Sequence, residues 1–315
     1  MNFGLDRAAG YGGLAALFFM ILRVRSYAKI NWILEVFGLR DDGYHELRTV
    51  LQTVDLFDTL IITKSETGKI EIECDNPEVP TDATNLVHRA VQMAAGRTGR
   101  EPGVKIRIEK RIPVAAGLGG GSSNAAATLL ALEKLWDVRL LPQDMFEIGT
   151  ALGADVPFFF FGGTAVGIGR GNEVYPVEDT QSPYLLLVNP GVSVSSRDAY
   201  NGLDSALTTK NPVAIMSFAL LTPYAHYLPP TVTRNDLEQS VLPRWPQIAE
   251  VKRRLQRTTA SSSAMSGSGA TVFAVYDSAD ARDRAAADLA ETGWLVIRTR
   301  TVGRSEYKSS LIEII

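Results

Sequence analysis

The chain has 315 residues, of which 45% are hydrophobic and 21% are charged. This length and composition predict one large or two moderate globular domains with a sizeable core. The 32 basic and 35 acidic side chains give a net charge of −3, which argues against a nucleic-acid-binding surface as the main function and leaves room for a local basic pocket. Cys74 is the only cysteine, so an intramolecular disulfide and a cysteine metal cluster are both excluded, and a reducing cytoplasm fits best.

Residues 1–21 are expected to be a leader outside the fold. Their apolar run, Leu14–Leu22, is shorter than the stretch of about 20 residues that spans a membrane. Arg23 and Arg25 follow the run where a signal-peptide cleavage site would lie, which disfavours a signal peptide or anchor. Met20 is an alternative translational start, because a strand-like segment begins directly after it.

The apolar pattern from residue 22 onward predicts a mixture of strands and helices. In chain order, the first half gives a strand at 22–37, a turn at 41–43, strands at 49–63 and 70–74, a helix at 85–97, a strand at 104–108, helices at 122–136 and 144–152, and a strand entered from 158–168. The second half gives a strand at 184–188, a helix at 247–257, a strand at 271–276, a helix at 279–291 and a strand at 294–299. We therefore expect an α+β protein with two domains, 22–180 and 181–315.

The segment Pro113–Ala126 contains a glycine-rich loop directly before the helix predicted at Ser122–Trp136. Glycines allow the backbone to approach a ligand closely, and the unpaired amides of a helix N-terminus attract anions. A Walker A loop is excluded because the loop has no lysine, and a dinucleotide fingerprint fails because Ser122 stands where a third glycine is needed. The loop is interpreted as a phosphate cradle, and a plain turn with a serine helix cap is the alternative.

Three segments in order resemble the motifs of GHMP kinases. They are Ser26–Asn31, the glycine-rich segment Pro113–Ala126, and Met265–Thr271. Two further segments, Asp41–Leu47 and Gly153–Phe159, are similar to the GHMP subfamily whose acceptor is 4-diphosphocytidyl-2-C-methyl-D-erythritol. The resemblance covers roughly residues 24 to 300.

This resemblance implies a two-domain GHMP kinase fold, with a ribosomal protein S5 domain 2-like N-terminal domain that binds ATP, a ferredoxin-like C-terminal domain, and the active site in the cleft between them. It implies transfer of the ATP γ-phosphoryl group to the 2-hydroxyl of the cytidine-diphosphate-linked methylerythritol, giving the 2-phosphate and ADP. This reaction belongs to the non-mevalonate route to isoprenoid precursors.

The resemblance assigns the chemistry to Asp155 as general base and to Lys29 as its cationic partner. Without it, Asp155 would be a turn residue and Lys29 a solvated surface lysine. The phosphates of ATP would be held by Pro113, Ala115, Gly117, Leu118, Gly119, Gly120, Gly121, Ser122 and Ser123. Mg²⁺ is expected to accompany ATP, held by Ser122 or Ser123 or mostly by water.

The acceptor is expected to contact Asn31, Tyr44, His45, Asp155, Tyr200, Gly267, Ser268 and Gly269. In the resembling subfamily the residue at Tyr44 stacks near the nucleoside and the one at His45 bonds the cytosine edge; Tyr200 would add a second stacking face. The alternatives are a packed strand entry for Tyr44 and His45 and a tight turn at 266–269. Phe158–Phe161 is interpreted as core, and Lys252–Arg254 as a solvated helix face.

Two other functions stay open. One is another GHMP small-molecule kinase acting on mevalonate, homoserine or a sugar. The other is a noncatalytic nucleotide-binding protein of the same fold, which would be expected to lack Lys29 or Asp155. Neither a nucleic-acid nor a membrane partner is expected, and the chain would be a cytoplasmic monomer or homodimer.

Overall fold

The structure is a computed structural model that describes residues 20–201, 203 and 232–315. The predicted leader, apart from Met20 and Ile21, lies outside the described residues. The first half of the chain contains β1 (Leu22–Leu39), β2 (His45–Lys64), β3 (Ile70–Cys74), α2 (Leu86–Thr98), β4 (Val104–Glu109), α3 (Gly120–Trp136), α4 (Pro142–Leu152), the 3₁₀ helix η1 (Val156–Phe160), β5 (Thr164–Gly169) and β6 (Glu173–Pro176).

The second half begins with a strand in a different sheet. Its elements are β7 (Leu185–Asn189), α5 (Ser196–Asn201), β8 (Arg234–Asn235), α7 (Glu238–Val241), α8 (Pro246–Gln256), β9 (Ser262–Met265), β10 (Val272–Val275), α9 (Ala279–Ala290), β11 (Leu295–Thr299), α10 (Arg304–Ser310) and β12 (Ile312–Ile314).

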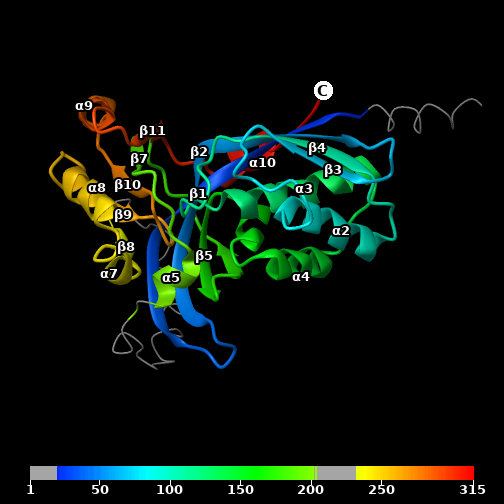
Figure 1. The fold of residues 1–315 in the computed structure, drawn as a ribbon, viewed down its shortest axis with the longest axis horizontal. Helices are drawn as coiled ribbons and strands as arrows, with labels where there is room; N and C mark the ends of the chain where they lie inside the picture. Colours follow the sequence, from blue (N-terminus) through cyan, green and yellow to red (C-terminus); the bar gives the residue numbers. More distant parts are fainter. Residues whose placement is uncertain (1–19, 202, 204–231) are drawn as a thin grey trace, which may run out of the picture.

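The larger sheet is built around the long antiparallel pair β1 and β2. Its main order is β12-β1-β2-β4-β3, and β5 pairs with the other half of β2. One face of this sheet packs against α2, α3 and α4, whose alanine and leucine side chains form a buried core with Val24, Leu60 and Ile106. Figure 1 shows these three helices together on one side of the sheet.

The smaller sheet has the order β11-β7-β10-β9, and all three strand pairs are antiparallel. With α8 before β9 and α9 before β11, this is the βαββαβ order of a ferredoxin-like domain, as expected. Alternate residues of β7 face opposite sides: Leu186 and Val188 pack with α8 and α9, while Leu185 and Leu187 pack toward β1 and β2. The two sheets are therefore joined by a buried core, in which the rings of Trp32 and Phe273 meet edge to face at 5.4 Å.

Several predicted boundaries shifted. The glycine-rich helix begins at Gly120 and not at Ser122, because Gly119 in a left-handed conformation (φ 71°) serves as its N-cap. The segment 158–168 leads into a strand, β5, as expected, and its first residues belong to the 3₁₀ helix η1. Phe158 and Phe159 in that helix are buried, as the core interpretation predicted.

The end of the chain returns to the larger sheet. β12 pairs with the first residues of β1, and Tyr307 and Leu311 belong to the core beneath α2 and α3. The C-terminus in Figure 1 accordingly lies beside the start of β1. The boundary near residue 180 stays a prediction, and the segment 301–315, which was assigned to the C-terminal domain, packs with the N-terminal half.

Candidate active site

A cavity of about 1270 Å³ lies where the two halves of the chain meet. Its wall includes the start of β2, the glycine-rich loop and the beginning of α3. The opposite wall comes from the α5 region and from the turn between β9 and β10, at Gly267 and Ser268. A cavity is therefore present where the site between the two halves was expected.

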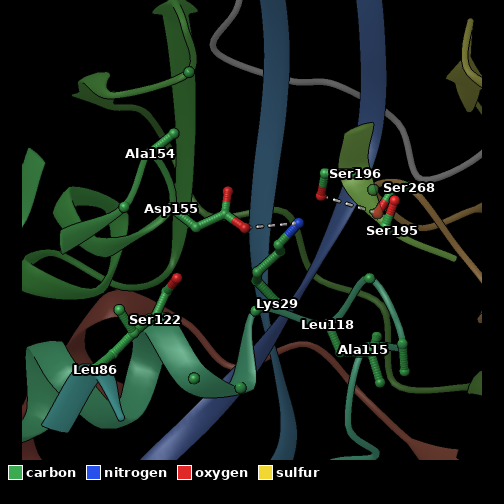
Figure 2. Close-up of a pocket in the computed structure, with 18 of the residues that line it drawn as sticks. Lys29, Leu86, Ala115, Leu118, Ser122, Ala154, Asp155, Ser195, Ser196 and Ser268 are labelled. Carbon is green, nitrogen blue, oxygen red and sulfur yellow. Dashed lines mark hydrogen bonds and ion pairs between the residues drawn. The ribbon is translucent and has the colours of Figure 1, made fainter. Parts of the chain in front are cut away.

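Lys29 and Asp155 meet inside this cavity (Figure 2). The ammonium Nζ of Lys29 lies 3.4 Å from Oδ2 of Asp155. Lys29 comes from the middle of β1 and its side chain is only 3% exposed, whereas the Asp155 side chain, just before η1, is 38% exposed. The geometry leaves the carboxylate open to a ligand, with the buried cation beside it.

The glycine-rich loop is hydrogen-bonded both to β1 and to the second half of the chain. The backbone carbonyl of Leu118 accepts a 3.0 Å hydrogen bond from the amide of Lys29, and the carbonyl of Gly117 accepts one of 3.0 Å from the Ser266 hydroxyl. Gly117 has φ +76°, and a Cβ there would lie 2.1 Å from the Ser266 carbonyl oxygen. Only glycine fits this crossing of two backbones.

The first turn of α3 faces the cavity. Gly120, Gly121 and Ser122 all line it, and the first amides of a helix have no partner within the helix. These donors, together with the positive end of the helix dipole, make this wall suited to an anion such as a phosphate. Lys29 lies next to this wall, since a Cβ on Gly119 would come 3.0 Å from its Cγ.

Aromatic and imidazole rings also line the cavity. The His45 ring stacks on Tyr200 with centroids 5.1 Å apart, and the guanidinium of Arg170 lies 4.3 Å above the Tyr44 ring. Burial lowers the pKa of the His45 imidazole below its ordinary value of 6.5, so it is neutral at pH 7. Burial, with a contribution from the Asp155 charge, raises the pKa of the Tyr200 phenol.

Most of the predicted site residues line the cavity. They are Lys29, Asn31, Tyr44, His45, Pro113, Ala115, Gly117, Leu118, Gly119, Gly120, Gly121, Ser122, Asp155, Tyr200, Gly267 and Ser268. The structure brings these residues together, and the roles assigned to them stay predictions.

Ser123 and Gly269 are not part of the cavity wall. Ser123 is buried on the other side of the first turn of α3, where its hydroxyl accepts a 2.7 Å hydrogen bond from Ser26. Gly269 lies within the turn, with its amide 2.9 Å from the carbonyl of Ser266. Consecutive residues of a helix point in different directions, so Ser122 and Ser123 face different surroundings. Their residue type alone does not show which of the two faces the cavity.

The sequence analysis missed several wall residues, above all Lys110 and Arg170. Lys110 lies beside Gly120 and pairs at 2.8 Å with the buried carboxylate of Asp58. Its place three residues before Pro113, next to Arg111, was a usable signal for a cation beside a phosphate loop. Arg170 gave no such signal, because it reaches Tyr44 only through the pairing of β5 with the start of β2.

Ser196 on α5 was also missed. Its hydroxyl lies 3.4 Å from that of Ser268, which links α5 to the turn after β9 (Figure 2). Both serines line the cavity, so two separate segments each contribute a hydroxyl group to its wall.

Among the described residues, no three His, Cys, Asp or Glu side chains gather as a metal-binding group. Within 20–201, 203 and 232–315, none of the helices combines the length and the apolar character that a bilayer crossing requires.

The chain matches two family models. Residues 85–163 match the GHMP kinases N terminal domain, and residues 233–293 match the GHMP kinases C terminal model. The first match covers α2, the glycine-rich loop, α3 and Asp155, and the second covers the turn with Gly267 and Ser268.

Two curated relatives are similar over nearly the whole described chain, and both are named 4-diphosphocytidyl-2-C-methyl-D-erythritol kinase. The protein from Geobacter sp. (strain M21) is 40% identical over 284 residues, covering 89% of this chain and 99% of the relative. The protein from Solibacter usitatus (strain Ellin6076) is 43% identical over 295 residues, covering 91% of this chain and 90% of the relative.

Two solved structures are similar as well. A crystal structure of 4-(cytidine 5′-diphospho)-2C-methyl-D-erythritol kinase aligns with a TM-score of 0.70 and 30% identity, covering 89% of this chain and 99% of the other. A homoserine kinase from Cytophaga hutchinsonii aligns with a TM-score of 0.69 over the full length of both chains, but at 18% identity it supports the fold alone.

Proposed function

Because the chain belongs to the 4-diphosphocytidyl-2-C-methyl-D-erythritol kinase family of GHMP kinases, we propose that it transfers the γ-phosphoryl group of ATP to the 2-hydroxyl of 4-diphosphocytidyl-2-C-methyl-D-erythritol. The products are the 2-phosphate and ADP, an intermediate step toward isoprenoid precursors. The observation that carries the proposal is the meeting of Lys29 and Asp155 in one cavity with the glycine-rich loop and the N-terminus of α3.

In this reaction Asp155 removes the proton from the attacking hydroxyl. A new bond forms between that oxygen and the γ-phosphorus, while the bond from the γ-phosphorus to the β–γ bridging oxygen breaks and ADP leaves. Lys29 stabilises the charge on the transferred group. The amides of Gly120 and Gly121 hold the phosphates in line, and such positioning accounts for most of the rate in phosphoryl transfer.

The oxygen donors of the cavity fit a magnesium ion that is held mainly by ATP and water. Mg²⁺ prefers oxygen ligands and usually takes only one or two from the protein. The Ser122 hydroxyl and the half-exposed Asp155 carboxylate are available in the cavity wall, whereas the Ser123 hydroxyl is already engaged with Ser26. When bound, the ion neutralises charge on the β- and γ-phosphates.

The ring cluster suits the cytidine end of the acceptor. Tyr44 is 56% exposed and offers a stacking surface, while the neutral His45 imidazole has both a donor and an acceptor for a cytosine edge. Tyr200 packs on His45 rather than facing Tyr44, so its first contribution is to hold the imidazole plane.

A coupled ADP-release assay tests the proposal. The purified protein is given ATP and Mg²⁺ with one acceptor at a time: the cytidine-linked methylerythritol, mevalonate, homoserine or galactose. We expect turnover with the cytidine compound alone, and none from a Lys29→Met variant purified in the same way, which controls for contaminating kinases. Turnover of mevalonate, homoserine or galactose without the cytidine compound would overturn the acceptor assignment.

Location and assembly rest on the sequence alone. The single cysteine fits a reducing cytoplasm. A monomer or a homodimer is proposed, and the described cavity is lined from one chain in either case.

A further inference from the structure

Beneath Lys29 runs a chain of three buried hydrogen bonds. The Lys29 ammonium donates to Oδ1 of Asn31 at 2.8 Å. Nδ2 of Asn31 donates to the hydroxyl oxygen of Thr49 at 2.7 Å, and the Thr49 hydroxyl donates to the backbone carbonyl of Ile33 at 2.8 Å. Lys29, Asn31 and Thr49 are each no more than 3% exposed, so water does not compete for these bonds.

The chemistry of the groups determines which is the donor and which is the acceptor in each of these three hydrogen bonds. An ammonium group can only donate, so the Asn31 atom that faces Lys29 must be the amide oxygen. The amide nitrogen then faces Thr49, whose oxygen must accept. A hydroxyl has a single proton, and that proton is used on the Ile33 carbonyl.

The pairing of β1 with β2 creates this arrangement. Side chains two residues apart on a strand point to the same face, which places Lys29 and Asn31 side by side. The register between β1 and β2 shifts between Asn31 and Ile33, and Thr49 lies opposite Leu34 just beyond that irregularity. This register shift brings both the Ile33 carbonyl and the Asn31 amide within hydrogen-bonding distance of the Thr49 hydroxyl.

We propose that Thr49 is a positioning residue for phosphoryl transfer, and this inference rests on the proposed kinase function. Thr49 fixes the orientation of the Asn31 amide, and Asn31 in turn aims the Lys29 ammonium at Asp155 and at the transferred group. Asn31 therefore acts through Lys29, in addition to any contact with the acceptor. Without an acceptor at residue 49, the buried amide nitrogen of Asn31 loses its partner, and the amide is then held only by its oxygen at Lys29.

Thr49→Val is the sharpest test, because valine keeps the shape and removes only the hydroxyl. We expect kcat to fall by about 10- to 100-fold, since a small misplacement of a catalytic group has an effect of that order. Thr49 lines the cavity, but its hydroxyl already bonds Asn31 and the Ile33 carbonyl, so the KM values for ATP and for the acceptor should stay within about threefold of the wild-type values. Thr49→Ser restores the hydroxyl and should restore kcat.

Thr164→Val is the matched control. Thr164 is also a buried threonine of the larger sheet, its hydroxyl bonds Gln52 at 2.6 Å, and it does not line the cavity. This variant should lose stability but keep kcat. Thr49→Cys, with a weaker acceptor, should give an intermediate kcat and replaces the valine variant if that protein does not fold.

Three results would overturn the inference. They are a wild-type kcat in the valine variant or in the cysteine variant, an equal fall in kcat for Thr164→Val, and a serine variant as slow as the valine variant. Failure of the proposed function is distinguishable, because in that case the wild-type protein itself shows no turnover of the cytidine compound.

Discussion

Lys29 and Asp155 come from segments more than a hundred residues apart and meet at 3.4 Å. Their difference in exposure decides their roles. The nearly buried lysine is held by Asn31 and can act as a fixed charge, while the more exposed carboxylate can reach a ligand. At this scale the site is an accessible carboxylate beside a buried ammonium that Asn31 holds in place, which is the geometry that the proposed mechanism needs.

Asp155→Asn removes the base and keeps the shape of the side chain. We expect kcat to fall by about 10²- to 10⁴-fold, the usual contribution of a general base, with ATP affinity little changed. Steady-state ADP release and equilibrium nucleotide binding check this. Asp288→Asn, an exposed aspartate on α9 away from the cavity, is the control. Normal turnover in the Asp155 variant would remove this residue from the mechanism.

We expect His45 to make acceptor binding sensitive to acid. Its folded-state pKa is lowered below the ordinary 6.5, so protonation favours the unfolded chain, and stability is complete above pH 6.5 and is lost as pH falls through the folded-state pKa. Protonation also removes the acceptor nitrogen that a cytosine edge can use. The KM for the cytidine compound should therefore be flat in the upper part of the range of about pH 5 to 8 and should rise toward the lower end.

The matched variant is His45→Gln, whose amide keeps a donor and an acceptor but does not titrate. Its KM should be independent of pH over the same range. An equal rise of KM in both proteins would show that another group controls acceptor binding.

At the scale of the element, the glycine-rich loop and α3 form one unit that is held from two sides. Gly117 crosses the backbone at Ser266, and Leu118 bonds the backbone of Lys29. The loop therefore ties the N-terminus of α3 to Lys29 and to the turn after β9.

Gly117→Ala tests this crossing. Its φ of +76° and a Cβ 2.1 Å from the Ser266 carbonyl oxygen predict a loss of at least about 2 kcal/mol in the free energy of unfolding, with weaker ATP binding. Gly96→Ala is the control: Gly96 lies in α2 with nothing within 4 Å of an added Cβ, and a gain of about 0.5–1 kcal/mol is expected. Urea unfolding measures both, and equal stabilities for the two variants would contradict the close approach.

Sequence patterns predicted most of these elements because local chemistry determined them. The alanine- and leucine-rich run of α3 and the alternation in β4 needed no tertiary information. The short strands β8 and β12 were not predicted, since two or three residues give no periodic signal and exist only through pairing with β1. Arg170 and Thr49 were not predicted as site residues for a related reason. Strand pairing between distant segments, and not a local sequence pattern, places them at the site.

At the scale of the whole molecule, α10 near the end of the chain packs against residues that lie next to the site. The Tyr307 hydroxyl donates a 2.5 Å hydrogen bond to the carbonyl of Phe159, and its ring lies 5.5 Å from that of Tyr27. A Cβ on Gly119 would in turn lie 3.0 Å from the Phe159 ring. The stability of the N-terminal half and the position of the loop therefore depend on α10.

Tyr307→Ala should reduce the free energy of unfolding by about 3–5 kcal/mol, as for other fully buried aromatic residues. Tyr175→Ala removes a ring that is 52% exposed and should change it by no more than about 0.5 kcal/mol. Denaturant unfolding followed by tryptophan fluorescence compares the two. A Tyr307 variant as stable as the Tyr175 variant would show that the C-terminal segment does not stabilise the larger sheet.

The most direct test of the central claim is a crystal structure of Asp155→Asn with a non-hydrolysable ATP analogue and the cytidine-linked acceptor. We predict the γ-phosphate at the amides of Gly120 and Gly121 and beside Lys29, with the acceptor 2-hydroxyl about 3–3.5 Å from the γ-phosphorus and next to residue 155. A triphosphate bound away from the first turn of α3, or an acceptor hydroxyl out of reach of residue 155, would contradict the account.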